Sequence, residues 1–308
     1  MEINKEHDLW VELFRPNTLE GYIGNESLIE KAKIWISNNE LPHLLFYGSA
    51  GTGKTTLAKI LANSIDSQLM YINASDENSV DVVRDKISRF ASSVGFKRWK
   101  VIILDEFDFM TPNAQAALRN LMETYSKTTR FILTCNYVEK IIDPIQSRCQ
   151  VFAITPPNKT DVAKRLVEVL EQNNVAYDIK DVAAIINSSY PDIRRAINAA
   201  QASVVNGNLQ LDKASAIQAN YMTEILDVLK NAKDKKASFT KIRQIIADSK
   251  VRDFTPMYTF LYDNLDEFAH GHIAPCILII AEAQYKDASV VDKEINIMAM
   301  FVNLLGEI

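Results

Sequence analysis

Short apolar runs alternate with amphipathic segments in the first half of the chain. The runs are apolar at every position rather than at alternate positions, as is typical of strands buried on both faces. Helical periodicity separates them, at Lys54–Ser64, Ser79–Ser93, Pro112–Tyr125 and Val138–Ser147. We predict strands at Leu44–Tyr47, Leu69–Ile72, Val101–Leu104, Phe131–Thr134 and Val151–Ile154. This alternation predicts an α/β domain with a five-stranded parallel sheet and helices on both sides.

The pattern changes after Thr155-Pro156-Pro157, and we predict no strand beyond this point. The later segments are amphipathic helices: Lys159–Gln172, Ile179–Ser188, Ile193–Val205, Thr223–Asn231, Ser238–Ser249, Pro256–Phe268 and Asp292–Leu305, with a charged turn at Lys233–Lys236. We expect three domains: the α/β domain at 1–156, a small helical domain at 157–222 and an all-α domain at 223–308.

Composition limits the functional classes. Hydrophobic residues make up 47% of the 308 residues, which excludes a largely disordered chain. The net charge of −5 excludes a globally basic coat for nucleic acid, so any such contact must be a local patch. The three cysteines form no CxxC pattern, and the four histidines have no ligand partner in sequence. Met1–Trp10 is charged and no apolar run reaches ~18 residues, so we expect an intracellular protein in a reducing compartment, without a membrane partner.

A glycine-rich segment follows the first predicted strand and precedes a helix. Gly48-Ser49-Ala50-Gly51-Thr52-Gly53-Lys54-Thr55-Thr56 fits the phosphate-loop pattern G-x-x-x-x-G-K-[ST]. Glycines allow backbone N–H groups to converge on phosphate oxygens, and the helix N-terminus adds partial positive charge. Lys54 is expected to neutralise the β- and γ-phosphates of ATP, and the Thr55 hydroxyl to bind Mg²⁺.

Two carboxylates, Asp105 and Glu106, follow the strand at Val101–Leu104. We expect Asp105 to hold Mg²⁺, directly or through water, and Glu106 to polarise the attacking water as general base. Solvated carboxylates at a strand end are the alternative, and Asp108 is expected to cap or hydrate the turn. Together with the phosphate loop, the pair predicts an ATP hydrolase.

Several further motifs resemble the AAA+ ATPases of sliding-clamp loaders, above all the small subunits of replication factor C. The opening Trp10–Pro16 is similar to the family's W-V-E-K-Y-R-P. The other segments that carry the resemblance are Ile72–Asp76, Val101–Asp108, Gln115–Arg119, Cys135–Tyr137, Ile145–Cys149 and Pro191–Arg195. The C-terminal third is less distinctive. The short chain and its ending, Glu294–Leu305, resemble the large clamp-loader subunit of T-even-type phages.

The resemblance implies roles for particular residues. Asn136 would be sensor 1, reaching the γ-phosphate or the attacking water, and Arg194 would be sensor 2, in the helical lid. Arg148, within Ser147-Arg148-Cys149, would be an arginine finger that serves the site of the next subunit. Simple structural roles remain the alternative for each, above all for the residues expected to line the adenine and phosphate pocket: Val11, Arg15 and Ile23.

The resemblance also implies partner surfaces. DNA phosphates would meet the start of the helix Val80–Ser93 and a basic cluster near Trp99, through Ser79, Arg84, Lys97, Arg98 and Lys100. A solvated helix face is the alternative. Asn78 stands where the family commonly has an arginine, so coupling between DNA and ATP would be weaker or carried elsewhere. Gln115 would transmit between subunits, and Glu26–Asn38 or Phe107–Thr111 would contact the clamp.

The expected protein is therefore an ATPase subunit of a DNA-polymerase sliding-clamp loader. It would act in a pentameric ring with copies of itself and a different subunit, on a ring-shaped clamp and primer–template DNA. It would work in the cytoplasm of an infected bacterium if it comes from a phage, and otherwise in cytoplasm or nucleus. Two alternatives stay open: a nucleotide-binding scaffold without turnover, and a branch-migration or helicase-type motor.

Overall fold

The computed structural model describes residues 9–211, 213–232 and 234–308, without the side chains of residues 213–220. The charged N-terminal segment Met1–Trp10 lies almost entirely outside these residues. The chain divides into two compact units, Met1–Val175 with Ser189–Ala202, and Ala176–Ser188 with Ser203–Ile308. The domain limits 1–156, 157–222 and 223–308 stay a prediction.

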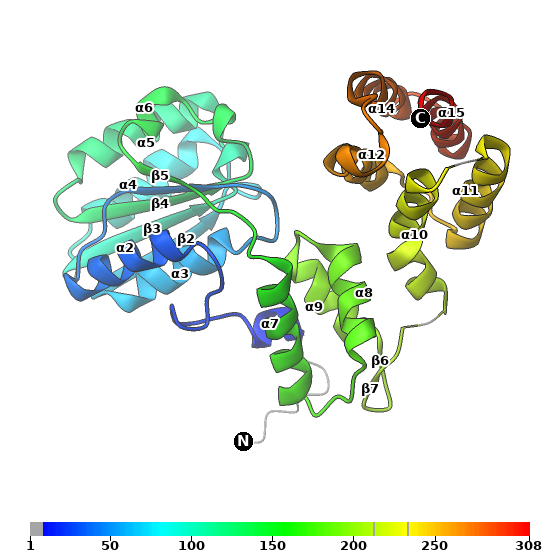
Figure 1. Ribbon diagram of the computed structural model, residues 1–308. Helices are drawn as coiled ribbons and strands as arrows, with labels where there is room; N and C mark the ends of the chain where they lie inside the picture. Colours follow the sequence, from blue (N-terminus) through cyan, green and yellow to red (C-terminus); the bar gives the residue numbers. More distant parts are fainter. Residues whose placement is uncertain (1–8, 212, 233) are drawn as a thin grey trace. The chain divides into compact units, whose positions relative to one another are not determined.

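The first unit contains a parallel sheet of five strands in the order β2-β3-β4-β1-β5 (Figure 1). The strands are β1 (Leu44–Tyr47), β2 (Ser67–Asn73), β3 (Trp99–Asp105), β4 (Thr129–Cys135) and β5 (Gln150–Ala153). All neighbouring strands of this sheet run parallel. The predicted α/β class and the five strands are confirmed.

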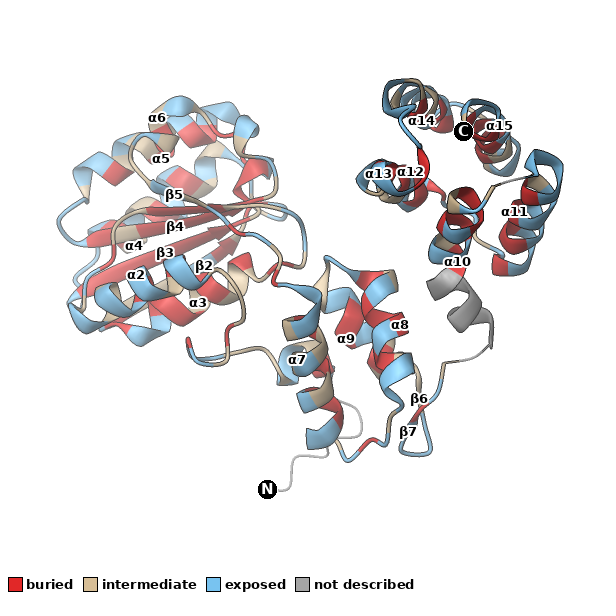
Figure 2. Ribbon diagram, in the orientation of Figure 1, coloured by how far each residue is buried: buried red, intermediate tan, exposed pale blue. Residues whose placement is uncertain are grey.

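Helices cover both faces of the sheet because alternate strand residues point to opposite sides. Leu44 and Phe46 pack with α2 (Glu26–Ser37) and α3 (Lys54–Ser64) in one apolar core. Leu45 belongs to a second core, with α5 (Pro112–Thr124) and α6 (Asp143–Gln146). The central strands are consequently buried along their length (Figure 2).

Two predicted helices are interrupted. The segment predicted as Ser79–Ser93 contains a π-helical stretch, η2 (Val82–Ile87), before α4 (Ser88–Ser92). The segment predicted as Val138–Ser147 divides into a 3₁₀ turn, η4 (Val138–Lys140), and α6. Pro144 explains the second break, because proline suits the first turn of a new helix and cannot continue an older one.

The N-terminal segment of the first unit is held on two later helices. It forms α1 (Trp10–Leu13), which packs against α9 (Ile193–Ala202). The Trp10 N–H donates to Gln201 Oε1 at 3.0 Å. Arg165, in α7 (Lys159–Gln172), donates from Nη2 to the Phe14 carbonyl at 2.8 Å. These contacts hold residues 10–14 against α7 and α9.

The described residues of the second unit form helices and one β-hairpin. Its helices are α8 (Ile179–Ser189, whose last residue belongs to the first unit), α10 (Lys213–Lys230), α11 (Lys235–Ser249), α12 (Thr255–Asp263), α13 (Leu265–Phe268), α14 (Ile273–Asp287) and α15 (Lys293–Glu307). Strands β6 (Val204–Val205) and β7 (Asn208–Leu209) pair antiparallel, so the prediction of no later strand was wrong. Of the predicted turn Lys233–Lys236, Lys233 lies outside the described residues, whereas Lys235 and Lys236 begin α11.

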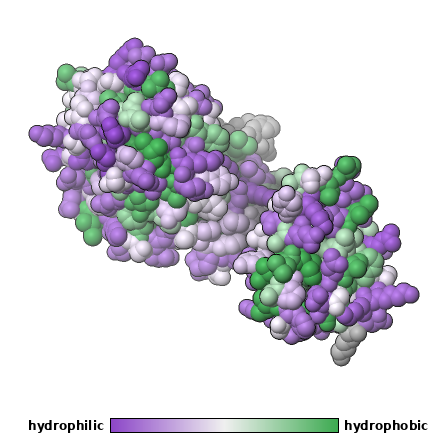
Figure 3. All heavy atoms as spheres, turned by 90° about the horizontal axis from the view of Figure 1, so that it is seen from above, coloured by the Kyte–Doolittle hydropathy of each residue, from purple (hydrophilic) through white to green (hydrophobic). Residues whose placement is uncertain are grey.

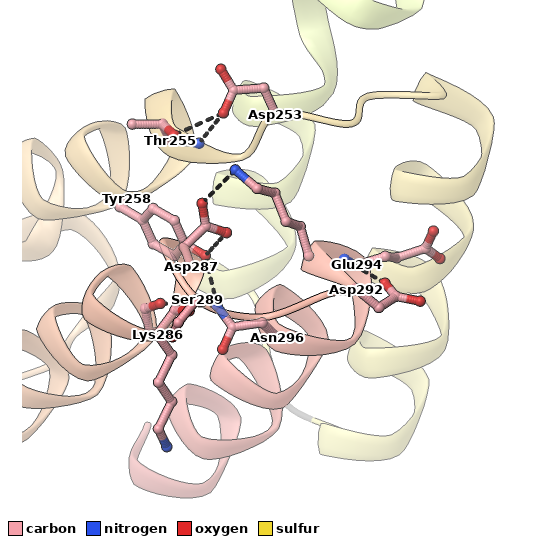
Figure 4. Close-up of polar contacts among 11 residues, drawn as sticks. Asp253, Thr255, Tyr258, Lys286, Asp287, Ser289, Asp292, Glu294 and Asn296 are labelled. Atoms are coloured by element: carbon pink, nitrogen blue, oxygen red, sulfur yellow. Dashed lines mark hydrogen bonds and ion pairs between the residues drawn. The ribbon is translucent and has the colours of Figure 1, made fainter.

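A buried polar network joins α12, α14 and α15 within the apolar core of this unit (Figure 4). The Tyr258 hydroxyl donates to Asp287 Oδ1, and Asn296 Nδ2 donates to the Tyr258 oxygen, both at 3.1 Å. Lys293 Nζ donates to Asp287 Oδ2 at 2.9 Å. Burial, reinforced by Asp287, raises the pKa of the Tyr258 phenol, which therefore remains a donor.

The surface alternates hydrophilic areas with hydrophobic patches (Figure 3). On the second unit, α14 exposes Leu278 and Tyr285, and α15 exposes Ile295 and Val302. Each pair is seven residues apart, so each marks one face of its helix. Among the described residues, no helix is long and apolar enough to span a bilayer.

Candidate functional site

Strand order brings three predicted motifs to one edge of the sheet. Parallel strands end at the same edge, and β4 lies between β1 and β3. Lys54 follows β1, Asp105 ends β3 and Asn136 follows β4. The three side chains therefore meet although they are far apart in sequence, at the place where α/β proteins commonly bind ligands.

The loop after β1 has the backbone that the phosphate-loop pattern predicts. Gly48, Gly51 and Gly53 have φ of 143°, 74° and 97°, values that favour glycine. A Cβ atom at Gly48 would lie 2.5 Å from the Ile154 carbonyl oxygen. No larger residue fits at Gly48 without displacing the neighbouring backbone.

Lys54 begins α3, and its ammonium group is held at the centre of this edge. Its Nζ donates to the carbonyl oxygens of Gly48 and Ser49, at 2.8 and 2.7 Å, and to Asn136 Oδ1 at 2.8 Å. Burial lowers the pKa of Lys54, although nearby acidic groups oppose the shift. Because its three partners are neutral oxygens, the positive charge remains available for an anion.

Asp105 receives hydrogen bonds from three hydroxyl groups. Thr55 Oγ1 donates at 2.8 Å to Oδ1 and lies 3.0 Å from Oδ2. Thr134 Oγ1 donates to Oδ1, and the Tyr71 hydroxyl donates to Oδ2 at 2.7 Å. The Thr55 hydroxyl and the Asp105 carboxylate are adjacent hard oxygen ligands, which fit Mg²⁺. The described residues hold no group of three or more His, Cys, Asp or Glu side chains suited to a metal.

The next two acidic residues differ in their surroundings. Glu106 lines the cavity and has a φ of 53°, unusual for a residue other than glycine. Its N–H donates to Thr134 Oγ1 at 3.2 Å, which helps to fix this conformation. Asp108 is buried rather than hydrating the turn: its Oδ1 accepts from the Asn136 N–H at 3.4 Å, while Oδ2 has no partner among the described residues. Asp108 thus orients the loop that carries Asn136.

These groups surround one cavity in the first unit. Val11, Arg15 and Ile23 lie on its wall, as does Arg194 at the start of α9. Sequence analysis assigned no site role to several other lining residues: Phe14, Pro16, Gly21, Tyr22, Thr134, Cys135, Arg165, Ile193 and Ile197. Tyr22 packs against Gly53, and its buried hydroxyl has no partner among the described residues. An arginine on an amphipathic helix, such as Arg165, gives no signal in a single sequence.

Arg148 lies outside this cavity. Its guanidinium group donates to Glu123 Oε1 and, at 2.7 Å, to the Pro144 carbonyl oxygen. The side chain is 33% exposed and borders a separate hollow beside Arg130 and Cys149. Arg148 is therefore not placed to serve the cavity of its own chain.

The predicted DNA contacts lie on the surface of the first unit. Ser79, Arg84, Lys97 and Arg98 are exposed. Lys100 is not, because it is buried and donates to the carbonyl oxygens of Ala91 and Ser93. The predicted basic cluster is thus smaller than the sequence indicated.

The apolar segment after the acidic pair is mostly core. Phe107 and Met110 are buried, and Phe109 is exposed. By contrast, Val94 and Phe96 are 88% and 98% exposed, next to Lys97 and Arg98. Of the segment Phe107–Thr111, expected as one candidate for clamp contact, Phe109 is thus the exposed apolar residue, and the more exposed apolar pair lies in a different loop.

Comparison with known proteins agrees with this geometry. Residues 44–157 match the model of the ATPase family associated with various cellular activities (AAA). A solved structure of the Thermotoga maritima RuvB Holliday junction branch migration motor superposes with a TM-score of 0.59 and 16% identity, over 93% of this chain and 91% of that chain. That likeness shows the fold alone. The sheet, the phosphate loop and the acidic pair define a nucleotide-binding AAA ATPase.

Sequence relatives specify the family more narrowly. The replication factor C small subunit of Sulfurisphaera tokodaii is 35% identical over 97% of this chain and 96% of its own length. That of Sulfolobus acidocaldarius is 41% identical over 68% of this chain and 66% of its own length. The chain belongs to the family of replication factor C small subunits and is an ATP-hydrolysing clamp-loader subunit of DNA replication.

Proposed function

We propose that the chain hydrolyses ATP as one subunit of a ring-like clamp loader, at a site completed by Arg148 of a neighbouring subunit. ATP binding closes adjacent subunits around primer–template DNA and opens the ring-shaped clamp, and hydrolysis releases the clamp on DNA. One observation carries the proposal. Lys54, Thr55, Asp105 and Asn136 converge on one cavity, whereas Arg148 lies outside it and is partly exposed.

The residues of the cavity have different roles in binding and hydrolysing ATP. Lys54 and Arg194 neutralise phosphate charge, and Val11, Arg15 and Ile23 hold the nucleotide against the phosphate loop, Gly48–Thr56. Thr55 and Asp105 would hold Mg²⁺, which would neutralise part of the phosphate charge. Glu106 accepts a proton from the attacking water, which Asn136 orients.

Arg148 makes turnover depend on assembly. An arginine that stabilises the charge of phosphoryl transfer accounts for roughly 10³–10⁵ in rate in other nucleoside triphosphatases. In the single chain this guanidinium is paired with Glu123. Assembly exchanges that partner for the neighbouring subunit's nucleotide.

DNA is held by a local patch on a chain whose net charge is −5. The exposed groups at Ser79, Arg84, Lys97 and Arg98 meet the phosphate backbone, which positions the duplex without reading its sequence. Asn78 is exposed and uncharged, so coupling between DNA and the ATP site is weaker or passes through another residue. Gln115 transmits between subunits, because its amide makes hydrogen bonds to the backbone of Met110, Lys140 and Ile142.

The remaining partners are other loader subunits and the clamp. We assign residues 157–222 to a lid and 223–308 to a collar that joins subunits into a pentamer of copies of this chain with a different subunit. The clamp meets exposed apolar groups of the ATPase unit. Ile34 on α2, Phe109, and the pair Val94 and Phe96 are exposed apolar candidates.

Steady-state ATP turnover of the assembled complex tests the proposal, with and without primer–template DNA and clamp. DNA plus clamp should stimulate the wild type, and Arg148→Ala should lose at least about 100-fold of that rate while still binding ATP. Arg148→Lys should not restore the stimulated rate, because a lysine side chain lacks the planar guanidinium group with its several N–H donors. Arg195→Ala, an exposed arginine next to Arg194 that does not line the cavity, serves as the control.

Other outcomes would favour the rival functions. Nucleotide bound without turnover in the complete complex would indicate a scaffold subunit. Turnover stimulated by DNA alone and insensitive to Arg148 would indicate a motor.

A further inference from the structure

Tyr71 connects the edge of the sheet to the acidic residue of the nucleotide site. It lies on β2, whose described partner is β3. The parallel register pairs Tyr71 with Ile103 and Asn73 with Asp105. Because side chains two residues apart share a face, Tyr71 lies on the same face as Asp105 and close to it. The Tyr71 hydroxyl donates to Asp105 Oδ2 at 2.7 Å.

The hydrogen bonds to Asp105 are distributed over both carboxylate oxygens. Thr134 donates to Oδ1, Tyr71 donates to Oδ2, and Thr55 reaches both. Thr55 is also the residue whose hydroxyl oxygen would bind Mg²⁺. The orientation of the carboxylate then depends on Thr134 and Tyr71, one for each oxygen. Neither of these two hydroxyls is needed as a metal ligand.

A side chain of α3, the helix that follows the phosphate loop, also contacts the Tyr71 ring. Lys59 Nζ lies 4.6 Å from the centre of the ring. Lys59 is four residues after Thr55 on α3, so both lie on one side of that helix. Tyr71 is 42% exposed, which leaves room for small substitutions without damage to the core.

We propose that Tyr71 is a positioning residue of the magnesium site, which orients Asp105 and thereby increases the affinity of the nucleotide-bound chain for Mg²⁺. The inference rests on the proposed function, since it assumes that Thr55 and Asp105 hold the ion. Groups that orient metal ligands through hydrogen bonds commonly contribute 10–100-fold to metal affinity. A bond that only stabilises the strand pair would leave that affinity unchanged.

The test titrates MgCl₂ into the full-length chain with a fluorescent ATP analogue, without clamp or DNA. Tyr71→Phe should raise the Mg²⁺ midpoint by about tenfold, with binding in EDTA unchanged. Tyr190→Phe is the matched control, because Tyr190 is also partly exposed and has Lys159 Nζ over its ring, 5.6 Å from the centre. It should leave the midpoint unchanged.

Different results would overturn different claims. A wild-type chain whose nucleotide binding ignores Mg²⁺ would contradict the proposed function. A normal wild-type response, with the same midpoint in Tyr71→Phe, would overturn only the role of Tyr71. If Tyr71→Phe lost nucleotide binding equally in EDTA and in Mg²⁺, the role of Tyr71 would also be overturned, because the substitution would then have damaged the site as a whole. Lys59→Ala keeps the Tyr71 hydroxyl but removes the ammonium group beside the Tyr71 ring. We therefore expect a smaller increase in the Mg²⁺ midpoint than in Tyr71→Phe.

Discussion

Lys54 and Asn136 are 82 positions apart in sequence, yet Lys54 Nζ donates to Asn136 Oδ1 at 2.8 Å. The contact follows from the sheet order, because the strands that precede the two residues are neighbours. In this arrangement the amide helps to satisfy the lysine ammonium, together with two loop carbonyls. Phosphate binding to Lys54 must therefore displace or rearrange at least one of these three hydrogen-bond partners.

Asn136→Ala should separate nucleotide binding from turnover. Lys54 keeps its two carbonyl partners, so the dissociation constant for ATP should change by less than about threefold. Loss of one group that acts on the reacting atoms commonly lowers kcat by about 100-fold. Single-turnover rates and ATP titration measure the two effects. Asn231→Ala, in the second unit, is the control, and an equal loss of affinity and rate would assign Asn136 to binding alone.

Glu123→Gln tests whether the ion pair of Arg148 matters beyond the single chain. An exposed pair of this kind contributes about 0–1 kcal/mol to the free energy of unfolding, so the melting temperature should change little. Turnover of the assembled complex should stay within about twofold of the wild type, because Arg148 is intact. If Glu123→Gln were as inactive as Arg148→Ala, the pair itself rather than a finger in trans would be required.

The elements that sequence analysis located correctly depend on local constraints. The strand Leu44–Tyr47 and the helix Lys54–Ser64 have the predicted limits. Their limits are clear in the sequence because the apolar run, the glycine-rich loop and the start of the helix follow directly one after another. The later hairpin was missed although Asn206 and Gly207, both at positive φ, are a common two-residue turn. Its strands have only two residues each, too few for an alternating pattern.

The parts of the site that sequence analysis missed depend on the register between strands and on packing. Tyr71 reaches Asp105 only because β2 and β3 pair in one particular register. Lys100 belongs by sequence to a basic cluster, but it is the second residue of β3 and caps the carbonyls that end α4. Asp108 is buried because it lies in the 3₁₀ turn η3 (Phe107–Phe109). None of these placements can be read from composition or periodicity.

Acid should destabilise the first unit through His43. Its Nδ1 accepts the Phe131 N–H at 3.1 Å, which requires the neutral ring. Burial, with the charge of Arg130, lowers the pKa of His43 to about 4. The unfolded chain binds this proton near pH 6.5 and the folded chain does not, so stability falls as pH decreases from about 6.5 to 4. The expected loss is on the order of 3 kcal/mol.

Chemical denaturation at a series of pH values measures this loss. His43→Gln keeps an acceptor and should flatten the dependence between pH 6.5 and 4, whereas His272→Gln, at an exposed position, should not. An unchanged slope in His43→Gln would show that carboxylates, rather than His43, cause the acid sensitivity.

Tyr258→Phe should destabilise the second unit without affecting nucleotide binding to the first. The hydroxyl donates to Asp287 and accepts from Asn296, and all three residues are buried. Its removal leaves both partners short of one hydrogen bond, which costs about 1–3 kcal/mol of unfolding free energy. Tyr262→Phe, on the same helix but 56% exposed, should change stability by less than about 0.5 kcal/mol. Urea denaturation with ATP titration on the same samples measures both effects. Equal stability of the two variants would mean that Lys293 alone is sufficient to hold Asp287 in place, and that the network adds little to the packing of α12, α14 and α15.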